Sequence, residues 1–225
     1  MLSIIIPCLN EADCIADTLA ALGPARQRGA EVIVVDGGSD DGTVGRAAPL
    51  ADSVISAPRG RASQMNAGAA RARGEILLFL HADSRPPEAT DGLIIDGLKR
   101  ARRSWGRFDV TIDGKHPLLR AVGRLMNIRS RLTGIATGDQ GIFVTRTLFT
   151  AAGGFPDIPL MEDVELSRRL KRFSSPLCLK HRIVTSGRRW ETRGVVRTIF
   201  LMWRLRLAYW LGADPHRLAM RYGGR

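Results

Sequence analysis

Carboxylates occur at several points of this 225-residue chain where they could bind or transform a phosphorylated ligand. Asp36 follows an apolar run and precedes two glycines, so it could hydrogen-bond a nucleoside whose approach the glycines permit. An Asx turn explains that pattern equally well. Asp83 could bind Mg²⁺ or Mn²⁺, which prefer oxygen ligands and bridge to diphosphates, although a helix N-cap explains an isolated Asp too. His81, two residues earlier, could ligate a softer ion or bind a phosphate.

A second pair of acids, Glu162 and Asp163, opens an expected helix. Acids at a helix start usually interact with the helix dipole, but a carboxylate here could also act as the general base that deprotonates an attacking hydroxyl. Asp139 and Gln140 stand between two glycines, which predicts either a ligand pocket or a plain turn.

Two adjacent arginines, Arg188 and Arg189, precede Trp190. Paired guanidinium groups can clamp a diphosphate and neutralise a leaving group, and the indole could stack on an acceptor ring. The alternative is a solvated basic loop anchored by one Trp. The patterns of a dinucleotide-binding loop and of a P-loop are absent from the sequence.

The elements that would position these residues alternate between strand and helix. Apolar runs at 2–6, 32–35, 53–56 and 76–80 predict four buried strands in two successive βαβ units, hence a parallel sheet covered on both faces. Further helices are expected over 64–73, 88–103, 118–132, 163–173 and 194–211, and further strands over 108–112, 142–144 and 177–184. Ligands bind beyond the carboxyl ends of such strands, where the polar clusters converge.

Local signals mark the ends of the first elements. Pro7 is expected to end the first strand, Asn10 to cap the helix after it, and Gly23 with Pro24 to close that helix.

The charge predicts anionic partners. The net charge is +12, and residues 165–225 carry fifteen Lys/Arg against three Asp/Glu. Nucleotide phosphates, nucleic acid or an acidic lipid surface would all fit. Three cysteines without a C-x-x-C pair fit a reducing compartment. We therefore expect a cytoplasmic protein, either free or peripheral at the inner face of the cell membrane.

The last expected helix, over 194–211, is rich in apolar residues but contains Arg197, Arg204 and Arg206. Three arginines argue against a membrane-spanning helix. Arg197 and Arg204 share a face and Arg206 lies opposite, so either an interfacial helix or one packed on the core is expected.

Taken together, these motifs resemble the family 2 glycosyltransferases over roughly residues 3–190. The family patterns P-x-x-N-E, V-D-D-G-S-x-D-G-T, D-x-D, E-D and Q-x-x-R-W resemble, in this order, residues 7–11, 34–43, 81–83, 162–163 and 186–190. Gly37, His81 and Ser186 replace an Asp, an Asp and the Gln of those patterns. The chain also resembles small bacterial enzymes of this family, some of them named carotenoid-acid (diaponeurosporenoate-type) glycosyltransferases.

The resemblance implies an α/β GT-A fold, with a mostly parallel central sheet flanked by helices. It implies an inverting transfer of a sugar from a nucleotide diphosphate, UDP favoured, to an acceptor hydroxyl or carboxyl that could be lipid-like. A divalent metal, Mg²⁺ or Mn²⁺, would bind at Asp83, and Asp163 would be the base beside Glu162. Donor nucleotide contacts are expected from Pro7, Asn10, Glu11, Asp36, Gly38, Asn66, His81, Ala82 and Asp83. Arg188 and Arg189 would bind the diphosphate, and Asp139, Gln140 and Trp190 would form the sugar or acceptor pocket.

The expected organisation is a catalytic domain over 1–190 and a basic, apolar helical extension over 191–225, packed on the domain or at the membrane surface. Two other functions are kept open. A sugar nucleotidyltransferase should show a Gly- and Arg-rich loop after its first strand, where this chain has residues 8–11. A non-catalytic protein that binds nucleic acid or anionic lipid fits the charge, but no nucleic-acid-binding motif is evident, so nucleic acid is not an expected partner.

Overall fold

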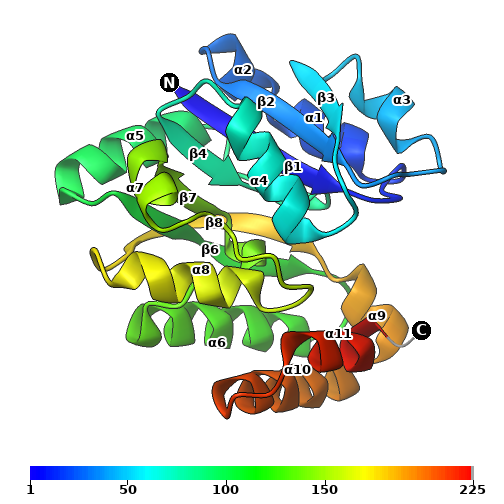
Figure 1. The fold of residues 1–225 in the computed structure, drawn as a ribbon. Helices are drawn as coiled ribbons and strands as arrows, with labels where there is room; N and C mark the ends of the chain where they lie inside the picture. Colours follow the sequence, from blue (N-terminus) through cyan, green and yellow to red (C-terminus); the bar gives the residue numbers. More distant parts are fainter. Residues whose placement is uncertain (224–225) are drawn as a thin grey trace.

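The computed structural model of the chain describes residues 1–223. Its centre is an eight-stranded sheet in the order β3-β2-β1-β4-β7-β6-β8-β5 (Figure 1). The strands are β1 Leu2–Cys8, β2 Glu31–Asp36, β3 Ser53–Ser56, β4 Ile76–Phe79, β5 Ser84–Arg85, β6 Trp105–Asp113, β7 Ile142–Thr145 and β8 Leu177–Ser186. The helices are α1 Ile15–Ala21, α2 Gly23–Gln27, α3 Thr43–Ala47, α4 Arg61–Arg71, α5 Thr90–Ala101, α6 Leu118–Thr133, α7 Arg146–Ala151, α8 Glu162–Lys171, α9 Arg188–Arg193, α10 Val195–Trp210 and α11 Pro215–Gly223, with a 3₁₀ turn, η1, at Gly138–Gln140.

The sheet has a parallel half and a mixed half. Strands β3, β2, β1 and β4 are all parallel, as the two βαβ units predict. Strand β7 is antiparallel to both β4 and β6, β8 is parallel to β6, and β5 is antiparallel to β8. The expected α/β fold with its helix-flanked sheet is confirmed.

Side chains alternate between two cores on the two faces of the sheet. Ile4 and Ile6 pack with residues of α1, α2 and α5, whereas Ile5 packs with residues of α4, α7 and α8. Gly68 allows the close approach of α4 to β1, because a Cβ atom there would lie 2.4 Å from Cγ2 of Ile5. Burial on both faces explains why these strands are continuous apolar runs.

Three local expectations were wrong. Pro7 lies inside β1, opposite Val35, and the strand continues to Cys8. Asn10 does not cap α1, because its side chain instead accepts a hydrogen bond from the backbone N–H of Asp40. Gly23 begins α2 rather than ending a helix, since Pro24 occupies the first turn, where a missing N–H costs nothing.

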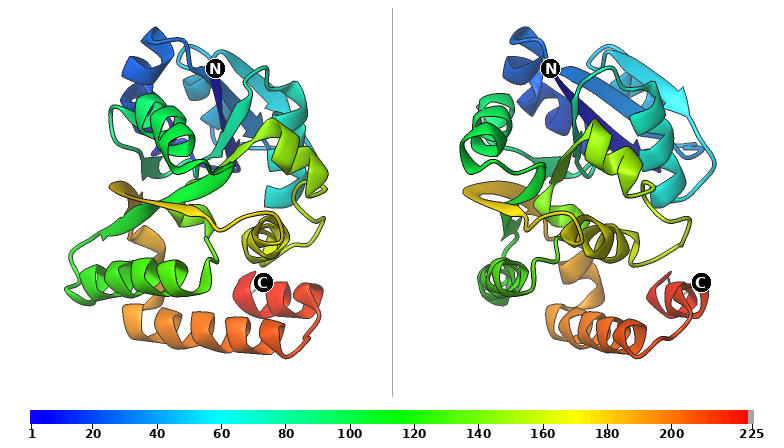
Figure 2. Two further views of the ribbon diagram at one scale, coloured as in Figure 1. Left: turned by 90° about the vertical axis from the view of Figure 1, so that its left-hand side faces the viewer. Right: turned by 60° about the vertical axis from the view of Figure 1, so that its left-hand side comes forward.

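The C-terminal helices cover the end of the molecule below the mixed half of the sheet (Figures 1 and 2). Helix α10 packs on α6 through Val195, which shares a cluster with Leu119 and Val122. Helices α10 and α11 enclose a further cluster with Leu160, through Leu205 and Leu218. Gly224 and Arg225, the end of the expected extension, lie outside the described residues.

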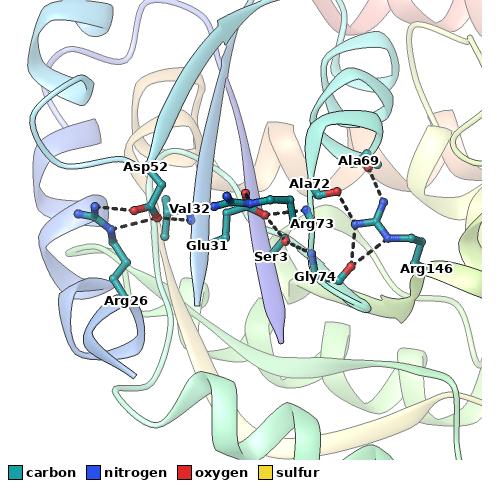
Figure 3. A network of polar contacts seen from close by, with 10 residues as sticks. All are labelled: Ser3, Arg26, Glu31, Val32, Asp52, Ala69, Ala72, Arg73, Gly74 and Arg146. Carbon is teal, nitrogen blue, oxygen red and sulfur yellow. Dashed lines mark hydrogen bonds and ion pairs between the residues drawn. The ribbon is translucent and has the colours of Figure 1, made fainter. Parts of the chain in front are cut away.

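A polar network ties together the amino ends of the parallel strands (Figure 3). The buried Glu31 carboxylate accepts hydrogen bonds from Ser3 Oγ at 2.6 Å and from N and Nε of Arg73 at 2.8 Å. Burial by itself raises the pKa of Glu31, but these hydrogen bonds outweigh it and hold the pKa below the ordinary 4.5. Arg146 contacts the carbonyl oxygens of Ala72 and Gly74 after α4.

A Glu31→Gln variant should therefore lose stability in a pH-dependent way. Because the folded-state pKa is lowered, the contribution of Glu31 is fully present above about pH 4.5 and is lost as the pH falls through the folded-state value. We expect a loss of about 1–3 kcal/mol at pH 7, measured by urea unfolding, and a smaller difference from the native chain at pH 3. Asp113→Asn, which removes an exposed ion pair with Arg85, should cost no more than about 1 kcal/mol. Equal effects of Glu31→Gln at both pH values would contradict this account.

Candidate functional site

A cavity of about 620 Å³ opens beyond the carboxyl ends of β1 and β4. Its wall combines segments distant in the sequence: the loop after β1, the start of α4, the residues after β4, η1, the start of α8, and α9 to α11. The predicted residues in the wall are Pro7, Glu11, His81, Ala82, Asp83, Asp139, Glu162, Asp163, Arg188, Arg189 and Trp190. The sheet edge predicted to hold the ligand is therefore hollowed.

The remaining predicted residues lie outside the cavity wall. Among the described residues, the cavity lining does not include Asn10, Asp36, Gly38, Asn66 or Gln140. Asn66 donates to the carbonyl of Phe155 at 2.8 Å and accepts from its N–H at 3.0 Å. Gln140 is fully buried and forms a capping box with Thr137. Both side chains fix loops, which explains their polar character without a ligand.

Asp36 organises the turn after β2. Its carboxylate accepts hydrogen bonds from the N–H groups of Gly38 and Ser39 at 2.9 and 3.0 Å, and from Ser39 Oγ at 2.5 Å. Burial raises the pKa of Asp36, but the hydrogen bonds from Ser39 and Gly38 outweigh burial and hold the pKa below its ordinary value, so the group is ionised at neutral pH. This is the Asx-type turn left open by the sequence. Asn10 joins it, since its N–H donates to Ser39 Oγ.

His81 and Asp139 form an ion pair in the cavity wall. Nδ1 of His81 lies 3.3 Å from Oδ1 of Asp139. Burial lowers the pKa of His81, but the hydrogen bond and charge of Asp139 outweigh it and raise the pKa above its ordinary value. The pKa of Asp139, raised by burial, is lowered overall by His81. The His that replaces an acid of the family pattern is thus paired with Asp139 two residues before Asp83.

The residues around Asp83 fit a cation that is shared with a substrate. Within residues 1–223, no cluster of three His, Cys, Asp or Glu side chains could hold a metal by itself. Mg²⁺ is usually bound by one or two carboxylates together with substrate phosphates, and Asp83 supplies one carboxylate in the cavity wall. Nδ1 of His81 already faces Asp139, which leaves Asp83 as the better ligand.

Glu162 and Asp163 lie at the start of α8 and line the same cavity. Met161 precedes them with a φ of 70°, a left-handed conformation that is uncommon for a non-glycine residue. Oδ2 of Asp163 accepts a hydrogen bond of 2.8 Å from the N–H of Gly138, which fixes the carboxylate against η1. Glu162 is 3% exposed. Burial raises its pKa, and Arg61, 3.6 Å away, offsets only part of that rise.

Gly138 connects the two acidic parts of the site. A Cβ atom there would lie 2.3 Å from Nε2 of His81, while the N–H of Gly138 holds Asp163. We expect Gly138→Ala to displace both side chains and to lower turnover about 100-fold or more, because small misplacements at a reacting centre are costly. Gly92→Ala, at an open position in α5, is the matched control and should keep native turnover in the same assay. Native turnover of Gly138→Ala would show that this spacing is unimportant.

The arginines of α9 play different parts. Arg188 pairs with Glu11 at 3.1 Å, and this acid raises the pKa of Arg188 despite burial. Burial lowers the pKa of Arg189, whose guanidinium lies 3.9 Å from the ring centre of Tyr222. Trp190 lines the cavity and packs beside the Leu119 cluster.

Several residues of the wall were not predicted. Arg61 begins α4 and pairs with Glu162, and Arg206, Met202 and Tyr222 come from α10 and α11. The Gly–Arg pair at the start of α4 was a usable signal for Arg61. The only sequence signal for Arg206 was its position on the expected helix over 194–211, opposite the face shared by Arg197 and Arg204. Cys8 also lines the cavity, but burial raises the pKa of its thiol to about 12, so it is no nucleophile at neutral pH.

Comparisons with known proteins relate this chain to one enzyme family. The family model described as "Glycosyl transferase family 2" matches residues 3–148. The mannosyltransferase PcManGT from Pyrobaculum calidifontis, in complex with GDP-Man and Mn²⁺, is 23% identical with a TM-score of 0.66, covering 92% of this chain and 60% of that chain. S. aureus TarS 1-349 in complex with UDP-GlcNAc is 17% identical with a TM-score of 0.68, covering 82% of this chain and 58% of that chain.

A third structure is the M. tuberculosis glucosyl-3-phosphoglycerate synthase in complex with Mn²⁺, UDP and phosphoglyceric acid. It is 19% identical with a TM-score of 0.56, covering 82% of this chain and 69% of that chain. No curated protein matches the chain. The chain therefore shares the fold of these enzymes at low identity, and spans only about 60% of the length of TarS 1-349 and PcManGT.

Proposed function

The chain belongs to glycosyl transferase family 2, and from this premise we propose that it transfers a sugar from a nucleotide diphosphate to an acceptor hydroxyl or carboxyl. The observation that carries the proposal is one cavity whose wall holds Asp83, Arg188 and Arg189 together with Glu162 and Asp163. Arginines beside a carboxylate that can bind a cation suit a diphosphate leaving group, and a further carboxylate suits the deprotonation of an acceptor.

The donor would lie along the carboxyl ends of β1, β2 and β4. UDP-sugars are the favoured donors, supported by the neighbour in complex with UDP-GlcNAc, and GDP-sugars come next. Glu11, Arg188 and Arg189 would contact the diphosphate side, and Asp36 would shape the nucleotide pocket through the turn that it holds together.

Transfer would be a single displacement with inversion at the anomeric carbon. The acceptor oxygen forms the new bond to that carbon as the bond to the diphosphate breaks, and Asp163 takes the proton of the acceptor. Glu162, whose pKa burial raises, would hold Arg61 at the cavity wall. Asp139 and Trp190 would border the sugar or acceptor.

Asp83 would hold a divalent cation, Mg²⁺ or Mn²⁺, which when bound neutralises charge on the leaving diphosphate. Two of the neighbouring structures contain Mn²⁺, which supports the choice of cation. His81 and the arginines would add positive charge on the same side of the site from the protein itself.

As predicted from the sequence, residues 1–190 would form the catalytic unit and 191–225 an extension, with Met202, Arg206 and Tyr222 of the extension contributing to the cavity wall. The basic extension would contact an anionic membrane, and a lipid-like acceptor, such as the carotenoid acids of the resembling enzymes, would suit that location.

Calorimetric titration with UDP tests the proposal, first with Mn²⁺ or Mg²⁺ and then with EDTA. Metal-dependent binding is the expected result, and it justifies assays with UDP-sugars. If only GDP binds, the donor class changes but the transferase proposal stands. Release of pyrophosphate from a nucleoside triphosphate and a sugar phosphate would instead favour a nucleotidyltransferase. Tight, salt-dependent binding of DNA or RNA without nucleotide binding would contradict both.

A further inference from the structure

One face of α10 is apolar and exposed. Its large side chains recur at the spacing of a single helical face, and we call this set the outer face of α10. It consists of Val196, Phe200, Trp203, Leu207, Trp210 and Leu211. Trp203 is 71% exposed and Trp210 is 80% exposed. Contiguous exposed apolar area on this scale marks an interaction surface rather than scattered surface residues.

The opposite face of the same helix belongs to the cavity. Thr198, Met202 and Arg206 line the cavity, and Leu205 packs with Leu218 of α11. This explains why Arg206 breaks the amphipathic pattern: it points into the site and not toward the outer face. One face of α10 therefore lines the cavity, and the other face is the exposed apolar surface.

The charges around the outer face are almost all positive. Between Val195 and Tyr222 the sequence carries five arginines and a single acid, Asp214. Arg197 and Arg204 are exposed and, at 100° per residue, lie together on one flank of the outer face. Arg217 and Arg221 add exposed positive charge from α11.

A second set of exposed apolar side chains lies on α6, the helix that α10 packs against. Leu125, Ile128 and Leu132 are exposed there. Arg124 and Arg131 are exposed on the same helix. Both helices lie at the end of the molecule away from β1 to β3 (Figures 1 and 2). This end of the molecule thus combines apolar and cationic surface.

We propose that the outer face of α10 docks onto an anionic lipid bilayer, with its apolar side chains among the acyl chains and its arginines at the head groups. Exposed Trp and Phe flanked by Arg are the composition of an interfacial helix. In the part of the chain that the structure describes, no helix is long and apolar enough to cross a membrane, so α10 would lie in the interface.

A second copy of the chain is a less suitable occupant. A twofold interface places the same surface patch on both subunits, and α10 has no acidic residue that could pair with the arginines of the other copy. Anionic head groups complement this charge.

The docked orientation adds an acceptor class to the proposed function, on which this part of the inference rests. A bilayer held against the outer face of α10 would lie about one helix diameter, roughly 10–12 Å, from the cavity wall formed by Met202 and Arg206, so a lipid acceptor would have to reach past α10 to enter the cavity. The acceptor would then be a lipid with its reactive hydroxyl or carboxyl at the head-group level.

Vesicle binding of the full chain tests the docking. We would compare sedimentation with vesicles of phosphatidylcholine containing phosphatidylglycerol and with pure phosphatidylcholine, and record the tryptophan fluorescence. The native chain should bind the anionic vesicles with a shift of emission to shorter wavelength. The double variant Trp203→Ser/Trp210→Ser should bind them at least about tenfold more weakly, because two exposed indoles supply much of the apolar area.

Two further variants separate the contributions. Phe173→Ser, which removes an aromatic residue that is 56% exposed at the end of α8, should bind within about twofold of the native chain, like a typical surface substitution. Arg197→Gln/Arg204→Gln should bind more weakly at low salt and depend less on salt, because charge attraction is screened.

UDP binding by the same variants keeps the two proposals distinct. Native UDP affinity of the tryptophan variant shows that it is folded, so weak vesicle binding then reports on docking alone. If neither the native chain nor any variant binds UDP or GDP, the transferase proposal is overturned and the docking result still stands. Native vesicle binding by the tryptophan variant, or a solution dimer that this variant dissociates, would overturn the docking.

Discussion

An Asp163→Asn variant is expected to turn over about 10²–10⁴-fold more slowly than the native chain, the usual contribution of a general base. The carboxylate lies in the cavity wall, and the N–H of Gly138 fixes it at 2.8 Å. An amide cannot take the proton of an acceptor, although its oxygen can still accept the hydrogen bond from the N–H of either Gly138 or Val164, both of which the carboxylate accepts. Turnover with a UDP-sugar, measured beside UDP affinity, checks this prediction, and the affinity should be unchanged.

The controls for Asp163→Asn use the neighbouring carboxyl groups. Asp157→Asn, on an exposed loop before α8, should keep native turnover. Glu162→Gln should lower turnover less than Asp163→Asn, because burial already keeps Glu162 more protonated than an ordinary carboxyl group. The opposite order of the two variants would move the role of base to Glu162. Native turnover of both variants would show that neither Asp163 nor Glu162 is the base.

The second large effect is expected from Asp83→Ala. If Asp83 shares a cation with the diphosphate, this variant should lose the metal-dependent part of UDP affinity, a weakening of at least about tenfold. Titrations with Mn²⁺ and with EDTA should then give the same dissociation constant for the variant but different constants for the native chain. Asp157→Ala should retain the difference, since its side chain lies on an exposed loop.

Asp36→Ala helps to interpret the result for Asp83. The carboxylate of Asp36 accepts hydrogen bonds from Gly38 and Ser39, so its removal leaves these partly buried donors without that partner. We expect weaker UDP binding together with lower stability to urea, whereas Asp83→Ala should change binding with little change in stability. Equal metal dependence in Asp83→Ala and the native chain would exclude Asp83 as the ligand.

Several parts of the molecule followed from local sequence. Apolar runs and their spacing predicted the four parallel strands, because burial on both faces requires continuous apolar residues. The rule that ligands bind at the carboxyl ends of such strands placed Glu11 and Asp83 at one edge. In the structure, Glu11, Asp83 and Asp163 line the same cavity. Turn details were less accessible, as Pro7 and Asn10 show, because their partners lie on another strand or loop.

The tertiary structure alone decided which polar side chains line the cavity. Asn66 and Gln140 look like binding residues in the sequence, yet their hydrogen bonds go to Phe155 and to the cap at Thr137. A hydrogen-bonding side chain has the same sequence signature whether its partner is backbone or ligand, and only the folded chain selects between them.

The sequence by itself determined the family resemblance, the α/β class and the edge where the chemistry gathers, since these depend on short-range patterns. The pairing of His81 with Asp139, and the two faces of α10, depend on packing between segments far apart in the chain. Arg206 is the clearest case, because helical spacing gives its angle around α10 but not which neighbour lies at that angle. The tertiary structure supplied that neighbour, the cavity.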